Sequence, residues 1–222
     1  MVSHGSDTIS SSIGNDTVFA GGGAVVDGGS ASRLTFVGGG GADTVSGGAG
    51  MLMVFGAAAG GVYTAGSGGG SVLVATAGNT TLTGGANHDA MYGSAAGGDV
   101  LQASDESGGG FDDLVAAGSA IMQDGSGNTM MYGGTGADLF SFSGGDSGIN
   151  RAVGFKQGTD RITLGGTPAA SVLQGATFSS SGTTFTVGRS RCPASIWLSR
   201  TSAEPIRQPM RPSPGGSPGK AP

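Results

Sequence analysis

A nine-residue, glycine-rich unit recurs along most of this chain and constrains its fold more than any other feature. The clearest copy, Gly133 to Ser141, reads Gly-Gly-Thr-Gly-Ala-Asp-Leu-Phe-Ser and fits the pattern G-G-x-G-x-D-x-U-x, in which U is a large apolar residue. The glycines allow tight turns at positive φ, and Phe140 follows on a short strand. A single unit cannot bury Phe140, so the unit has to stack on other copies of itself.

A nine-residue register can be followed from residue 2 to residue 141 as fifteen blocks, with extra residues at Gly56, at Gly93 and at residues 103–106. Thirteen of the fifteen residues at the eighth position are apolar, as expected of a shared core. These residues are Ile9, Val18, Asp27, Phe36, Val45, Val54, Thr64, Leu73, Leu82, Met91, Leu101, Leu114, Met122, Met131 and Phe140. The alternation around them predicts strands of about three residues. The sequence therefore predicts an all-β parallel β-roll, or β-solenoid, in which two blocks make one coil.

Composition and charge narrow the class of protein. The chain has 49 glycines among 222 residues without a Gly-X-Y period, which excludes collagen. Helices are disfavoured because each glycine in a helix interior costs about 1 kcal/mol. Residues 1–188 hold 14 acidic and 4 basic side chains, so this part of the chain is strongly acidic. An acidic surface argues against nucleic-acid binding and favours binding of cations.

The sequence contains no obvious targeting feature that would indicate the cellular compartment of the protein. The first residues, Met1 to Gly5, have no basic or apolar region of the kind that makes a signal peptide. The longest apolar run, Met51 to Ala59, is far shorter than the ~20 residues needed to span a bilayer, so no membrane span is predicted. The single cysteine, Cys192, excludes an internal disulfide.

Three copies of the unit are complete: GGGGADTVS at residues 38–46, GGANHDAMY at residues 84–92 and GGTGADLFS at residues 133–141. This repeat resembles the hemolysin-type calcium-binding repeat, also called repeats-in-toxin, which forms a parallel β-roll. Shorter matches of the form G-x-D-x-U lie at residues 5–9, 14–18, 97–101 and 110–114. The resemblance implies Ca²⁺ binding and an extracellular, secreted protein exported by a type I route with an uncleaved C-terminal signal.

The end of the chain departs from the repeat. Residues 154–164 resemble the segment that follows the β-roll in serralysin-type secreted proteins, and two strand-like runs around Ser179 to Gly182 predict a hairpin. We therefore expect a C-terminal β cap over residues 142–188, which would cover exposed strand edges. Residues 189–222 hold seven of the eight prolines and six basic residues, which predicts a disordered basic tail or, alternatively, a frame-shifted end.

The resemblance also implies where calcium would bind. In that family each Ca²⁺ lies between turns two blocks apart and is held by the sixth-position aspartates of both turns and by backbone carbonyls. Seven of the fifteen sixth positions are aspartate here, and one pair, Asp89 with Asp112, is complete. The candidate metal ligands are the aspartates Asp89, Asp112, Asp99, Asp43, Asp138, Asp7 and Asp16, with the turn residues Gly84, Gly85, Asn87 and Gly110.

Most of the remaining sixth positions carry no carboxylate, and Ca²⁺ affinity depends on the number of ligand charges. The sequence therefore predicts few and weak Ca²⁺ sites, concentrated between residues 84 and 115. Half-sites with one hydroxyl are Ser71/Asp89, Thr80/Asp99 and Asp112/Thr129. Asp7, Asp16, Asp43 and Asp138 each face an aliphatic residue in this scheme. Alternatively, a lone aspartate is a turn residue that bonds its own backbone. The inserted residues 103–106 either disturb the Asp89/Asp112 pair or add Asp105 and Glu106 as ligands.

The function predicted from these patterns is that of a non-catalytic calcium-binding module of an exported protein. Its folding would be linked to Ca²⁺, because binding to the folded state stabilises it by mass action. No catalytic constellation stands out in the sequence. Three alternatives stay open: a repeat module of a larger secreted protease, lipase or epimerase, an adhesin fragment, and a degenerate solenoid that binds no metal. Any protein or polysaccharide partner stays unnamed.

Overall fold

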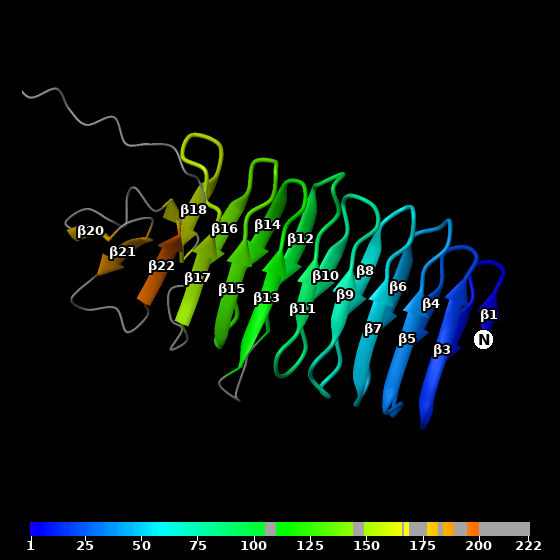
Figure 1. Cartoon of the computed structure of the whole chain (residues 1–222). Helices are drawn as coiled ribbons and strands as arrows, with labels where there is room; N and C mark the ends of the chain where they lie inside the picture. The colour runs from blue at the N-terminus through cyan, green and yellow to red at the C-terminus, as the bar shows by residue number, and fades with distance from the viewer. Residues whose placement is uncertain are drawn as a thin grey trace, which may run out of the picture.

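The chain is a parallel β-solenoid of about 8 turns, as the nine-residue repeat predicts. The computed structural model describes residues 1–104, 110–143 and 149–165, and beyond them the backbone of four short strands. Every regular element among these residues is a strand. Figure 1 shows the strands stacked side by side along one axis, with the N-terminus at one end of the stack.

Successive strands alternate between two sheets, so that two repeats complete one coil. Sheet A contains the odd-numbered strands β1 (Val2–Ser3), β3 (Asn15–Ala20), β5 (Arg33–Val37), β7 (Met51–Phe55), β9 (Val72–Val74), β11 (Ala90–Tyr92), β13 (Phe111–Val115), β15 (Asn128–Tyr132) and β17 (Ile149–Val153). Sheet B contains the even-numbered strands β2 (Thr8–Ser10), β4 (Val25–Asp27), β6 (Asp43–Ser46), β8 (Gly61–Thr64), β10 (Thr81–Thr83), β12 (Asp99–Gln102), β14 (Ala120–Gln123), β16 (Leu139–Phe142) and β18 (Arg161–Leu164).

Glycines at the corners allow the coils to stack closely. Backbone hydrogen bonds continue from the strands into the turns, where Gly47 N donates to Thr64 O over 2.7 Å. A Cβ atom added to Gly85 would overlap the carbonyl oxygen of Gly66 in the preceding coil. A side chain at that corner would therefore force the two coils apart, which explains why the repeat needs glycine there.

Each repeat places at least one apolar side chain in the interior, and two repeats differ from the predicted register. Val26 and Tyr63 point inward and are 1% and 0% exposed, in place of the predicted Asp27 and Thr64. Val26 comes eight residues after Val18, so the turn before it is one residue shorter than a strict nine-residue period requires. Tyr63 comes nine residues after Val54, so the extra residue expected at Gly56 falls after Tyr63 instead. In both repeats burial of an apolar side chain outweighs the predicted spacing. With this correction all fifteen inward residues are apolar and buried. The thirteen others are the apolar residues predicted from the eighth position.

Both parallel ladders continue beyond residue 141, where the β-roll was predicted to end. Strands β17 and β18 pair in parallel with β15 and β16. Ala152 is fully buried, and Phe155 packs against Phe140 with ring centroids 6.0 Å apart. The beginning of the predicted cap region is thus one more coil of the solenoid.

Antiparallel strands follow this last coil. Strand β19 (Thr167–Pro168) pairs with β18, and β20 (Thr177–Ser181) pairs with β21 (Thr184–Gly188) at the place where a hairpin was predicted. Strand β22 (Ser195–Ser199) pairs with both β17 and β21, although it lies inside the segment predicted to be a disordered tail. The rest of the predicted tail lies outside the described residues.

Candidate metal centre

The sixth-position residues of the repeats form one row along a corner of each sheet, because equivalent residues pair across successive coils. The row on sheet A runs through Asp16, Leu34, Leu52, Ser71, Asp89, Asp112, Thr129 and Asn150. The row on sheet B runs through Asp7, Ala24, Asp43, Gly61, Thr80, Asp99, Ala120, Asp138 and Asp160. The three predicted half-sites are therefore neighbours on adjacent coils.

All of the buried aspartates in these rows except Asp43 are held by two backbone N–H groups each. Asp89 is 1% exposed, and its Oδ2 accepts a hydrogen bond of 2.6 Å from Gly85 N in its own turn. Its Oδ1 accepts a bond of 2.7 Å from Ser71 N in the preceding coil. The first bond is the local turn contact that the alternative interpretation of a lone aspartate predicts, whereas the second ties two coils together.

The same arrangement recurs in both rows. In each case one oxygen accepts from the aspartate's own turn and the other from the preceding coil. The donors are Ser94 N and Thr80 N for Asp99, Ser104 N and Asp89 N for Asp112, Gly134 N and Ala120 N for Asp138, and Lys156 N and Asp138 N for Asp160. These carboxylates thus have a structural role that does not depend on a metal ion.

Asp89 and Asp112, the predicted complete pair, lie on adjacent coils of the same corner. Asp89 N donates to Asp112 Oδ1 over 2.8 Å, and the two side chains are 1% and 0% exposed. Burial raises the pKa of Asp89, and the negative charge of Asp112 raises it further. A divalent cation between the two carboxylates would offset this repulsion.

A second complete pair, Asp138 with Asp160, corrects the prediction that Asp138 faces only an aliphatic residue. Asp138 has Ala120 on one side and Asp160 on the other, with Asp138 N donating to Asp160 Oδ1 over 3.0 Å. Burial raises the pKa of Asp138, and Asp160 adds to this effect while Lys156 opposes it. The sequence signal for Asp160 is the match G-x-D-x-U at residues 158–162, which lies inside the segment predicted to form the cap.

The other four candidate aspartates have no carboxylate neighbour, and Asp99 lies between Thr80 and Ala120. Asp7 accepts from Ser3 Oγ over 2.6 Å, and Asp16 accepts from Ser11 Oγ. Asp43 is 1% exposed, and its Oδ1 accepts from Ala24 N over 2.7 Å. Because of the register shift, Asp43 lies between Ala24 and Gly61 rather than between Val25 and Val62, the sixth-position residues of the nine-residue register.

The four turn residues predicted to support the Asp89/Asp112 pair differ in their hydrogen bonds and backbone conformation. Gly84 N donates to Gln102 O over 2.8 Å, while Gly85 N is bonded to Asp89. Asn87 adopts a left-handed conformation with φ of 64°, and the carbonyl oxygen of Gly110 accepts from Asn128 Nδ2 over 3.1 Å. The proposed extra ligands Asp105 and Glu106 lie outside the described residues.

The candidate ligand atoms along the corners are oxygens, which hard cations prefer. Among the described residues, no group of three or more His, Cys, Asp or Glu side chains is placed to hold a metal ion. A cation would therefore need hydroxyl, amide and main-chain oxygens besides a carboxylate pair, and Ca²⁺ accepts such mixed oxygen ligands. Thr129 Oγ1 and Asn150 Oδ1, which continue the row after Asp112, are buried without a hydrogen-bond partner. Asp43 Oδ2, on sheet B, is also buried without a hydrogen-bond partner.

A hollow of about 780 Å³ lies beside the second pair. It is lined by residues of β12, β14, β16 and β18 and of the turns before these strands, including Asp138, Phe155, Thr159 and Arg161. Asp138 therefore borders the hollow, although its side chain is 2% exposed.

Buried carboxylates predict a pH dependence of stability. Burial raises the pKa of Asp43, Asp89, Asp113 and Asp138 above the usual value of 3.8. The folded state therefore binds these protons more tightly than the unfolded state does, and this contribution to stability is lost as the pH rises through the raised pKa values. We expect the melting temperature of the metal-free chain to fall as the pH rises from about 4 to 7, because the loss of stability begins just above the unfolded value of 3.8. Circular dichroism melts in a chelator would check this, and a melting temperature that rises with pH would contradict it.

These features define the chain as a parallel β-solenoid with carboxylate pairs at two of its corners. Comparison with protein-family models, curated proteins and solved structures gave no match. Within the described part of the chain, no helix is long and apolar enough to span a bilayer.

Proposed function

We propose that the chain is a non-catalytic calcium-binding β-solenoid of an exported protein, with sites at the Asp89/Asp112 and Asp138/Asp160 corners. The observation that carries the proposal is the stacking of two buried carboxylates on adjacent coils at both places. The nonapeptide motifs, which resemble the hemolysin-type repeat, support the same assignment.

In this proposal the cation binds at corners whose carboxylate, hydroxyl and main-chain oxygens are already brought together by the fold. Asp89 and Asp112 would hold Ca²⁺ together with oxygens of the same row, of which Thr129 Oγ1 is buried and unpaired. Asp138 and Asp160 would do so beside the hollow at the end of the solenoid. Bound Ca²⁺ would offset the repulsion within each pair and stabilise the folded chain by mass action. Folding would then be favoured where calcium is abundant, as it is outside the cell.

A second candidate function is that of a metal-free structural solenoid, such as a spacer in an adhesin. The observation in its favour is that each paired carboxylate already accepts two backbone hydrogen bonds. In that case the aspartates act only as hydrogen-bond acceptors that join turn and sheet, and added calcium would have no effect on the chain.

Calcium titration separates the two candidates. We expect isothermal titration calorimetry to detect about two Ca²⁺ sites with dissociation constants on the order of 10⁻⁴–10⁻³ M, the range of extracellular modules. The melting temperature should rise with millimolar Ca²⁺ and not with the same concentration of Na⁺. Asp112→Asn and Asp138→Asn should each remove about one site.

Asp27→Asn is the matched control, because Asp27 is exposed and belongs to neither pair. It should leave both sites intact. An unchanged melting temperature and no binding heat at about 10 mM Ca²⁺ would contradict the proposal and favour the metal-free solenoid. Loss of binding in the Asp27→Asn control would show that the sites lie elsewhere.

A further inference from the structure

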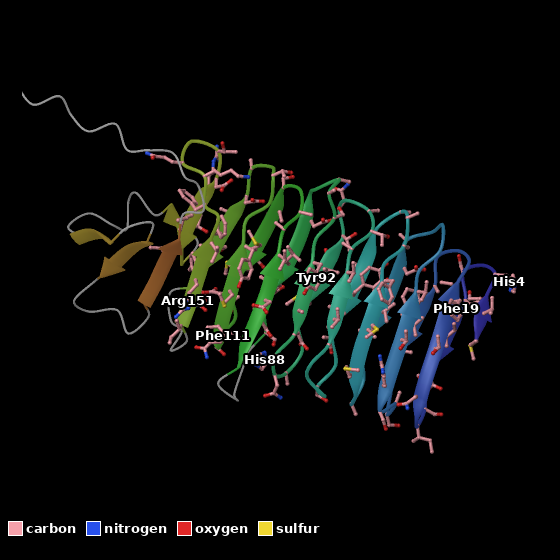
Figure 2. The ribbon with its side chains drawn as sticks, in the orientation of Figure 1. His4, Phe19, His88, Tyr92, Phe111 and Arg151 are labelled. Atoms are coloured by element: carbon pink, nitrogen blue, oxygen red, sulfur yellow. The ribbon has the colours of Figure 1, made fainter. Side chains whose placement is uncertain are left out.

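The outer face of sheet A has the composition of a protein–protein interface. Its outward residues on β1 to β17 include five aromatic residues and three methionines, but no lysine or glutamate. The aromatic residues and methionines are Phe19, Phe55, Tyr92, Phe111, Tyr132, Met51, Met53 and Met130. Aromatic residues, methionine and arginine are enriched in interfaces, whereas lysine and glutamate are depleted. Figure 2 shows Phe19, Tyr92, Phe111 and Arg151 on this side of the molecule.

One row of outward side chains is apolar along the whole sheet. The strand register places these residues on successive coils, with an aromatic residue on every second coil and a valine between. The row is Val2, Phe19, Val37, Phe55, Val74, Tyr92, Val115, Tyr132 and Val153. Phe19, Phe55 and Tyr92 are 48%, 43% and 41% exposed.

Sheet B differs on its outer face, which shows that the apolar row is not a general property of the repeat. No outward residue of sheet B on β2 to β18 is aromatic. The row equivalent to the one on sheet A consists of polar residues: Ser10, Asp27, Ser46, Thr64, Thr83, Gln102, Gln123, Ser141 and Thr163.

The outer face of sheet A is large enough for a specific interface. Nine strands at a spacing of ~4.8 Å cover about 38 Å, and three outward positions along a strand cover about 13 Å. The projected area is therefore about 500 Å² per copy, or about 1,000 Å² in a pair of faces. Specific interfaces begin near this size, and exposed apolar patches of several hundred Å² mark interaction sites.

We propose that this face binds a second copy of the same chain, sheet A against sheet A, in a two-fold symmetric dimer. A two-fold axis parallel to the strands and midway between β7 and β9 brings every aromatic residue of the row opposite a valine of the partner. Phe55 then faces Val74, Phe19 faces Val115, Tyr92 faces Val37 and Tyr132 faces Val2. The alternation of large and small side chains makes the face complementary to itself, as an isologous interface requires.

Sedimentation velocity of the full chain, in reducing buffer because of Cys192, tests the dimer. We expect a species of twice the chain mass with a dissociation constant on the order of micromolar, since the area is at the lower limit for specific interfaces. Phe55→Asp with Tyr92→Asp should give a monomer with an unchanged circular dichroism spectrum. The matched control, Val62→Asp with Ile121→Asp on sheet B, changes side chains that are 46% and 39% exposed and should leave the dimer intact.

A pair of volume swaps tests the proposed register. Phe55→Val alone places valine against valine and should weaken the dimer by about tenfold or more, as loss of a central aromatic contact does. Adding Val74→Phe to the same chain restores a ring opposite a valine across the axis and should recover most of the affinity. Both variants keep outward apolar residues, so their melting temperatures when dilute should stay close to that of the unchanged chain.

Several results would overturn the proposal. A chain that stays monomeric at about 100 μM has no such dimer, and its face would belong to a different partner. A dimer that survives Phe55→Asp with Tyr92→Asp, or dissociates in the sheet B control, uses another surface. Growth into open-ended assemblies would indicate end-to-end association, and failure of Val74→Phe to rescue Phe55→Val would exclude the two-fold arrangement.

Discussion

Replacing Phe36 with alanine is expected to lower the free energy of unfolding by about 3–5 kcal/mol, the cost of emptying a fully buried aromatic position. Phe36 is 0% exposed and lies between Val18 and Val54 on the inward row of sheet A. Its ring centroid is 6.1 Å from that of Tyr63 on sheet B, so the substitution also removes a contact that joins the two sheets. The cavity would persist because the stacked coils on either side hold the backbone in place.

Urea denaturation followed by circular dichroism measures this loss. Phe19→Ala is the control, because Phe19 lies on the adjacent strand of the same sheet but points outward and is 48% exposed. In dilute protein it should cost less than about 1.5 kcal/mol, since only part of the ring is removed from water in the folded chain. Equal costs at the two positions would contradict the assignment of inward and outward faces.

Asp99→Ala is expected to cost about 2–6 kcal/mol without any change in calcium binding. Asp99 is 1% exposed and accepts hydrogen bonds from Thr80 N over 2.9 Å and from Ser94 N over 2.6 Å. Alanine would leave these two backbone donors without an acceptor, and each unsatisfied buried group costs about 1–3 kcal/mol. Because no carboxylate lies on the neighbouring coils, the loss should be the same in a chelator and in Ca²⁺.

The same denaturation experiment, performed in both buffers, checks this result. Asp27→Ala serves as the comparison, because Asp27 is exposed and accepts only a local bond of 3.0 Å from Gly29 N. It should cost less than about 1 kcal/mol. If Asp99→Ala were equally mild, the two-bond arrangement would not matter for stability. A loss seen only in the presence of calcium would instead make Asp99 a metal ligand.

The candidate sites were only partly predictable from the repeat. The neighbours Asp89 and Asp112 follow from counting blocks, because their separation spans two repeats, the extra residue Gly93 and the inserted residues 103–106. The pair Asp138 with Asp160 does not follow from the repeat, because Asp160 comes 22 residues after Asp138 rather than the 18 of two repeats. The bonds from each carboxylate to the preceding coil could not be predicted, because they depend on how closely the corners stack.

The sequence by itself determined that glycine corners alternate with single buried apolar residues, and hence that the chain stacks into a β-solenoid of two parallel sheets. Only the tertiary structure decided that Val26 and Tyr63, rather than Asp27 and Thr64, face the interior. It also decided that the aromatic residues of sheet A align in one row. The physical reason is that local periodicity specifies turns and strands, whereas the partner of each residue depends on how many residues the intervening corners hold. That number is set by the burial and hydrogen bonding of the stacked coils together.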